Sequence, residues 1–272
     1  MKKLFLSFAL VLSLLTCYAQ NGKTSPVLKE HKQKRNLPPG TVWLRDSLCI
    51  DQTEIRNMDY MEFVKWTKVH EPQQLQAVLP DTTVWHQGEV AATWGIESWY
   101  FQHPAYREYP VVGVSYEQAI PFCKWRTDRV KEFIALSKQS IQERLGVRDF
   151  YYRLPTKKEW EYAAAAGTEV PVYGQNVINE KNVPNVFVAE TKALYAGNMG
   201  GFSDAVPVKY QFPNRYNLYN TIGNVAEMVE EKGIAKGGSF DHPLEQCAIP
   251  FAVEYTKPMR WLGFRCVCVM VK

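Results

Sequence analysis

The sequence predicts a mixed fold of helices and strands, with long irregular segments between short regular elements. Within residues 41–50, the apolar pairs Val42 with Leu44 and Leu48 with Ile50 are each spaced two apart, which is typical of a pair of short strands. From Asn57 the spacing changes, because Tyr60, Phe63 and Val64 recur at helical intervals. Aromatic residues, Pro and Gly are scattered through the stretches between these elements, so we expect loops packed on aromatic anchors rather than a regular bundle or barrel.

Further elements follow in chain order. The apolar run Pro110–Val114 predicts a strand, and Ser115 with Gln118 forms a capping box that starts a helix. The helical pattern continues past Pro121, where we expect a kink, as far as Ile141, and Gly146 is a stop signal.

A second strand and helix form a similar unit. Residues 151–154 are predicted to form the strand, and Thr156 with Glu159 forms a second capping box. The helix that follows is expected over Trp160 to Ala166, ended by Gly167.

The first residues predict export. Lys2 and Lys3 precede an apolar run that is long enough for a secretory signal and short for a membrane-spanning helix. Cleavage after Ala19 gives a signal peptide over residues 1–19 and places the protein in the periplasm or outside the cell. The alternative is a lipoprotein signal, in which Cys17 carries the lipid and anchors the protein to a membrane, for example the outer membrane.

Residues 20–40 are predicted to be a disordered basic tether, because they offer almost no apolar side chain to bury. The whole chain carries a net charge of +4; Lys2 and Lys3 contribute two of these charges and the tether a net four. The remaining body is therefore near −2, which excludes the basic footprint of a nucleic-acid-binding protein. A basic arm for phosphate or lipid headgroups is the alternative for the tether.

The segment between Glu71 and Tyr109 lacks a sustained period and is rich in aromatic residues. Core packing explains most such residues. The alternative is a stacking platform for a sugar, which would use Trp85, Trp94 and Trp99.

Six groups of residues then occur in a fixed order along the chain. They are Thr53-Glu54-Ile55-Arg56-Asn57; Val112-Gly113-Val114-Ser115-Tyr116 with Cys123-Lys124-Trp125; Arg153-Leu154-Pro155-Thr156-Lys157-Lys158-Glu159-Trp160-Glu161-Tyr162-Ala163; Asn217-Leu218-Tyr219-Asn220 with Gly223-Asn224-Val225-Ala226-Glu227; Lys236-Gly237-Gly238-Ser239-Phe240; and Gly263-Phe264-Arg265-Cys266. In this order they resemble the formylglycine-generating enzyme, or sulfatase-modifying factor, family. The resemblance implies an α+β, C-type-lectin-like fold with little regular secondary structure over residues 41–272.

The resemblance also implies a disulfide. In the family, the cysteine of the first capped helix is bonded to the one that follows Gly-Phe-Arg, and these positions are Cys123 and Cys266 here. Export makes such a bond compatible with the compartment. Cys49 and Cys268 are further candidates for pairing or are buried thiols.

The family's enzyme activates oxygen at a copper ion held by two cysteines, and here the first of these positions is His242 and the second is Cys247. Two thiolates suit Cu(I), whereas one thiolate and one imidazole do not give the same site. We therefore expect a degenerate site at Ser239, His242 and Cys247, without copper and without the family's catalysis. A weaker metal site at His242 and Cys247 is the alternative.

A calcium site is also implied by the resemblance. The family binds calcium through the side chains at Asn220 and Glu227 and through the carbonyls at Gly223 and Val225. These are oxygen donors, the type that a hard cation prefers.

The sequence therefore predicts an exported, non-catalytic domain that acts as a binding or scaffold component of the cell envelope, with an envelope protein as its partner. Its analogues would be the gliding-motility and type IX secretion lipoproteins that share this fold. The alternatives are a formylglycine-generating or related oxidase and a sugar-binding accessory protein.

Overall fold

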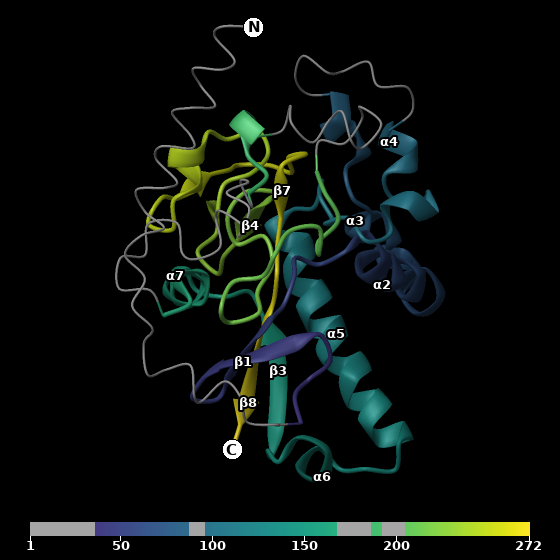
Figure 1. Cartoon of the computed structure of the whole chain (residues 1–272). Coiled ribbons are helices and arrows are strands. Elements are labelled where there is room, and N and C mark those ends of the chain that lie inside the picture. The colour runs from purple at the N-terminus through teal and green to yellow at the C-terminus, as the bar shows by residue number, and fades with distance from the viewer. Residues whose placement is uncertain (1–35, 87–95, 168–185, 192–204) are drawn as a thin grey trace, which may run out of the picture.

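The computed structural model describes residues 36–86, 96–167, 186–191 and 205–272 (Figure 1). The predicted signal peptide, Cys17 and nearly all of the predicted tether lie outside these ranges. Within them the chain forms an α+β domain of two small sheets and several helices, as the sequence predicted. None of the helices in the described ranges combines the length and apolar character that a membrane span needs.

The first sheet brings together the two ends of the domain. Its antiparallel strands follow the order β1 (Thr41–Arg45), β2 (Leu48–Asp51), β8 (Val267–Val271) and β3 (Asp149–Arg153). The predicted strand pair at residues 41–50 and the predicted strand near Tyr151 are confirmed.

The three long helices are α2 (Asn57–His70), α5 (Tyr116–Leu136) and α7 (Lys157–Ala165). The first two begin where the sequence predicted, whereas α7 begins at Lys157, directly after its cap Thr156 and before the predicted start at Trp160. The capping boxes at Ser115 and Thr156 are both formed, so each cap satisfies backbone N–H groups that the first turn leaves open.

Alternation along the strands gives the first sheet two apolar faces. One face packs with α5 side chains such as Phe122 in the largest core cluster, and the other packs with Ala163 of α7. Figure 1 shows α5 and α7 on opposite sides of β3 and β8. Both faces of the sheet thus contribute buried side chains to a core cluster.

The second sheet is made of very short strands. Its order is β6 (Val253–Glu254), β5 (Ile234–Lys236), β4 (Ala226–Met228) and β7 (Leu262–Gly263). Only the β4 and β7 pair is parallel. The strands are short because the chain leaves the sheet at glycines with positive φ, such as Gly233 and Gly237.

Two further predicted elements differ from the structure. Residues Pro110–Val114 do not form a strand, because Pro110 makes one isolated bridge to Arg56 and Gly113 turns the chain with φ of 68°. The helix expected to reach Ile141 ends at Leu136, and a separate helix α6 (Ile141–Leu145) begins with its own capping box at Ser140. Gly146 ends α6 in the left-handed conformation, as predicted.

In the residues that the structure describes, the aromatic segment between α2 and α5 forms only short helical turns. These turns are η2 (Pro72–Gln74), α3 (Leu75–Val78), η3 (Thr82–His86), α4 (Ile96–Trp99) and η4 (Pro104–Tyr106). Another 3-10 turn, η5 (Leu244–Cys247), follows β5.

The two sheets are joined by one buried guanidinium. Arg265 donates through Nε and Nη2 to the two carboxylate oxygens of Glu227 in β4, both at 2.6 Å. It also donates to the carbonyls of Asp51, Gln52 and Tyr219, at 2.8–3.3 Å. Arg265 and Glu227 are both fully buried. Every guanidinium nitrogen therefore has a partner, which is what a buried charge requires.

We expect Arg265→Lys to destabilise the domain by roughly 3–5 kcal/mol, the range for breaking a buried ion pair. An ammonium has three N–H donors on one atom, so it cannot serve both oxygens of Glu227 and three carbonyls at once. Urea unfolding of the purified protein measures the change.

Arg129→Lys is the matched control. Arg129 pairs with Glu132 on the surface of α5. Arg129→Lys should therefore lower the free energy of unfolding by less than about 1 kcal/mol. Equal losses in the two variants would show that the Arg265 pair does not join the sheets as described.

Candidate functional site

The candidate site is the loop Gly237–Cys247, between β5 and the end of η5. Gly238 has φ of 59°, and a Cβ atom at this position would collide with Cys247. Only glycine allows the backbone to approach the thiol this closely. The Glu190 carboxylate accepts from the backbone N–H of Leu244 at 3.1 Å, which fixes the start of η5.

Three polar groups of the loop bond to one another. Ser239 Oγ and His242 Nδ1 are 2.6 Å apart, and the N–H of Asp241 donates to Ser239 Oγ at 3.1 Å. The His242 ring also packs edge-on against Trp261, with the ring centroids 4.8 Å apart. Asp241 pairs with Arg260 at 2.6 Å. The imidazole is therefore held on one side by a hydroxyl and on another by an indole.

Burial shifts the pKa of two side chains in this loop, His242 and Cys247. It lowers the pKa of His242, so the imidazole is neutral at pH 7. It also raises the pKa of the Cys247 thiol well above its usual range. Cys247 is fully buried, and its Sγ contacts the carbonyls of Ser239 at 3.9 Å and His242 at 3.8 Å.

The loop does not fit the copper centre that the family resemblance implies. A thiol must lose its proton to bind a metal, and the Cys247 thiol is in surroundings that retain it. The family's copper ion is held by two thiolates, and the loop Gly237–Cys247 has a single cysteine. In the described part of the chain, no group of three or more His, Cys, Asp and Glu side chains is placed to hold a metal ion.

The residues predicted to bind calcium lie close to the Arg265–Glu227 pair that joins the two sheets. Gly223 has φ of 77° and bridges to Phe187, and Val225 is fully buried. The Asn220 amide donates to Glu54 at 3.2 Å and to the carbonyl of Val208 at 3.1 Å. Its Oδ1 is buried and, among the described residues, has no donor.

A calcium ion held through the Glu227 carboxylate does not fit this arrangement. Both oxygens of Glu227 accept from Arg265, and one also accepts from Trp160 Nε1 at 2.7 Å. The guanidinium neutralises the only charged ligand of the predicted set, and a cation beside it would be repelled. Asn220 Oδ1 is the one predicted side-chain ligand atom that remains open.

Glu54 is a buried member of this network to which the sequence analysis gave no role. Its oxygens accept from Asn224 at 2.8 Å and from Asn220 at 3.2 Å. Burial is the main cause that raises the pKa of Glu54 to about 8; Arg265 opposes this rise and the nearby Glu227 carboxylate adds to it. The signal in the sequence that could have indicated this role is the acidic residue within the first of the six ordered groups, Thr53 to Asn57.

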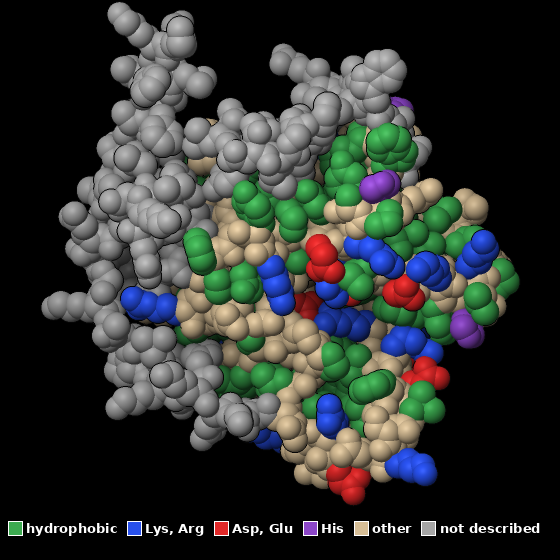
Figure 2. Space-filling model, turned by 45° about the vertical axis from the view of Figure 1, so that its right-hand side comes forward, with side chains coloured by type: hydrophobic (Ala, Val, Ile, Leu, Met, Phe, Trp, Pro, Cys, Tyr) green, Lys and Arg blue, Asp and Glu red, His purple; other side chains and the backbone are tan. Residues whose placement is uncertain are grey.

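A cleft of about 390 Å³ lies away from the loop, between α2 and α5. Its lining includes Glu54, Arg56, Trp125 and Arg126. The Arg56 and Arg126 side chains are paired with Asp59 and Asp51. Figure 2 shows basic and acidic side chains side by side on the face it presents, without a broad patch of one sign.

The proposed aromatic platform is not formed as predicted. Trp85 is 4% exposed and packs against Tyr100, with ring centroids 4.6 Å apart. Trp99 is 56% exposed, and Trp94 lies outside the described residues. Trp85 is a core residue, so it cannot stack on a sugar.

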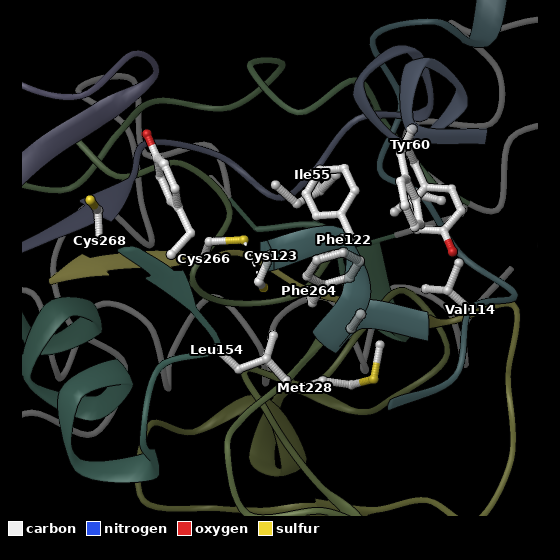
Figure 3. Close-up of a cluster of buried hydrophobic side chains, with 14 of the residues drawn as sticks. Ile55, Tyr60, Val114, Phe122, Cys123, Leu154, Met228, Phe264, Cys266 and Cys268 are labelled. Atoms are coloured by element: carbon white, nitrogen blue, oxygen red, sulfur yellow. Dashed lines mark hydrogen bonds between the residues drawn. The ribbon is translucent and has the colours of Figure 1, made fainter. Parts of the chain in front are cut away.

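The predicted disulfide partners lie side by side. Cys123 of α5 and Cys266 before β8 have sulfur atoms 3.5 Å apart, among the buried side chains of the main core cluster (Figure 3). The structure has thiols at both positions, so the covalent bond stays a prediction.

Comparison with known proteins assigns this architecture to a family. Residues 17–270 match the model of the sulfatase-modifying factor enzyme 1-like domain. The chain belongs to this family.

Curated relatives of the chain include active and inactive members. Over 208 residues it is 25% identical to the formylglycine-generating enzyme of Mus musculus, covering 68% of this chain and 49% of that protein. Over 123 residues it is 32% identical to the inactive C-alpha-formylglycine-generating enzyme 2 of Bos taurus, covering 44% of this chain and 32% of that protein. The chain thus spans about half the length, or less, of these relatives.

Solved structures share the fold. A protein named CarF matches with a TM-score of 0.53 and 21% identity, over 83% of this chain and 87% of that chain. PvdO from Pseudomonas aeruginosa matches with a TM-score of 0.50 and 18% identity, over 82% and 80%.

The raised pKa of Glu54 predicts a pH-dependent stability. The folded protein holds a proton on Glu54 that the unfolded chain releases above pH 4.5, so this contribution is complete below pH 4.5 and is lost as the pH rises to about 8. We expect Glu54→Gln to remove that loss. The difference in unfolding free energy between variant and parent should then move in favour of the variant, by on the order of 1 kcal/mol or more, between pH 5 and pH 8.5.

The control is Glu62→Gln, because Glu62 is an exposed carboxylate that lines the same cleft as Glu54. For this variant, the difference in unfolding free energy from the parent should not change between pH 5 and pH 8.5. A flat difference for Glu54→Gln as well would contradict the protonated state of Glu54.

The calcium prediction has a direct test. Because Arg265 already satisfies Glu227, we expect the melting temperature after chelation to stay the same when millimolar calcium is added. A ligand bound to the native state must raise it by mass action. Magnesium at equal concentration controls for ionic strength, and a rise with calcium alone would restore the predicted site.

Proposed function

We propose that this protein is an exported, non-catalytic member of the family that serves as a binding or scaffold component of the cell envelope. The observation that supports it most is the loop at Ser239, His242 and Cys247. There a histidine stands at the first copper-cysteine position and bonds to Ser239, while the remaining thiol is buried and protonated.

Two further observations support the proposal. One relative of the chain is named as an inactive member of the family. The described domain is also stabilised by internal pairs such as Arg265 with Glu227, which do not depend on a substrate or an ion. A domain of this kind is suited to presenting a surface to an envelope protein, as the gliding-motility and type IX secretion lipoproteins of this fold are expected to do.

The catalytic alternative is tested with a sulfatase-derived peptide that contains the target cysteine. The purified full chain is supplied with copper and a reductant, and the peptide is read by mass spectrometry for formylglycine. We expect no turnover, because a protonated thiol and a bonded imidazole do not supply two thiolates. The active mouse relative serves as the positive control. Formylglycine formed by the parent chain above the level given by Cys247→Ala would overturn the non-catalytic proposal.

The binding role requires a second experiment. Tagged protein is crosslinked in envelope membranes and recovered, with an excess of untagged protein as competitor. We expect one or a few envelope proteins to be recovered in near-stoichiometric amounts and to be displaced by the competitor. Recovery that the competitor does not reduce would count against a specific partner.

A further inference from the structure

Thiols gather on one face of the first sheet. Cys49 of β2 and Cys268 of β8 belong to the core cluster under α5, together with Cys123 and Cys266. Their chain neighbours Leu48, Ile50 and Val267 belong instead to the cluster on the opposite face. Because side chains alternate along a strand, Cys49 and Cys268 point to the same side of the sheet.

These two cysteines are also directly opposite each other. The antiparallel register of β2 and β8 pairs Cys49 with Cys268. Backbone hydrogen bonds join Asp51 N to Cys266 O at 2.9 Å and Met270 N to Ser47 O at 2.7 Å, two positions to either side. Since hydrogen-bonded pairs recur at every second position, the Cys49 and Cys268 pair is one of them, with α-carbons about 5.5 Å apart. Disulfides span about 4.4–6.8 Å between α-carbons and about 3.5–4.5 Å between β-carbons. The β-carbons of directly opposite residues lie about 4.5–5.5 Å apart and are farther apart in a hydrogen-bonded pair, so the bond requires β2 and β8 to move closer together locally.

We propose that Cys49 and Cys268 form a disulfide that links β2 to β8, in addition to the expected Cys123–Cys266 bond. The new bond would close a loop over almost the whole domain, which restricts the unfolded chain strongly. It would join the first hairpin to the last strand, at the place where the two ends of the domain meet.

The geometry keeps the two pairs apart. Cys123 and Cys266 are already within 3.5 Å of each other, and Cys268 lies two residues further along β8 (Figure 3). Cys49 Sγ lies 3.4 Å from Met270 Sδ, on the far side of Cys268 from Cys266. Cys247 belongs to a different core cluster and stays a thiol.

The chemistry is thiol–disulfide exchange. A disulfide oxidant, either an oxidoreductase or glutathione disulfide, is attacked by one thiolate to give a mixed disulfide, and the second thiolate then displaces the oxidant. The protein loses two electrons and two protons, and the oxidant becomes two thiols. Both cysteines are fully buried, and burial beside Cys49 raises the pKa of Cys268, so the bond forms during folding, before β8 is covered. In the cell this rests on the proposed export, whereas the test below does not.

The test maps disulfides in the full chain. Reduced, unfolded protein is refolded in a glutathione redox buffer, quenched in acid, alkylated and digested with trypsin without reduction. Cys49, Cys123 and the Cys266–Cys268 pair fall in peptides 46–56, 108–124 and 266–272. We expect all three peptides in one linked species, and fragmentation between Cys266 and Cys268 assigns each bond. Cys247 should be alkylated.

Two matched variants separate the bonds. Cys266→Ala should leave peptide 46–56 linked to 266–272, and Cys268→Ala should leave only the link from 108–124. Alkylated Cys49 in the refolded parent, beside an intact Cys123–Cys266 bond, would overturn the proposal, and so would a Cys49–Cys266 bond. The parent result stands even if a variant fails to fold. Thiols found reduced in cells but oxidised in the refolded chain would count against export and leave the pairing intact.

Discussion

The buried pair of Arg265 and Glu227 is the interaction on which the rest of the structure depends. Glu227 lies in the short second sheet, and Arg265 leads into the last strand of the first sheet. The guanidinium also binds carbonyls at the end of β2, and Trp160 of α7 donates to the same carboxylate. Two small sheets and a helix thus meet at one charge pair. Neither sheet is large enough to be stable alone, so their common joint must be fully hydrogen-bonded.

The joint that holds the family's fold together and the candidate loop use different residues. The loop at Ser239 and His242 begins directly after β5, next to the joint, but supplies none of its hydrogen bonds. Replacing a metal-binding cysteine by His242 therefore leaves the sheets unchanged. The loop is instead stabilised by its own contacts, namely the hydroxyl of Ser239, the ring of Trp261 and the glycine that faces Cys247. Fold and chemistry are separable because they use different residues.

Features that depend on residues close together in the sequence could be predicted, whereas contacts between distant residues could not. Capping at Ser115 and Thr156 depends on residues three apart, so helix starts are predictable, and the ordered landmarks indicated the family. The strand expected at Pro110–Val114 failed because Gly113 turns the chain to meet Asp81, a distant contact. The ion pair of Glu227 was not predicted for the same reason, since its partner Arg265 is far along the chain. The opposition of Cys49 and Cys268 depends on strand register, which the residues alone left open.

The most direct test of the account is a copper(I) competition titration of the purified full chain against a chromogenic chelator, with Cys247→Ala beside it. If the loop does not bind copper, because its thiol is protonated and its imidazole is bonded to Ser239, the two proteins withdraw the same small amount of copper from the chelator. A tight, one-to-one site in the parent that is lost in Cys247→Ala would contradict the account, and would show that the metal chemistry of the family persists here.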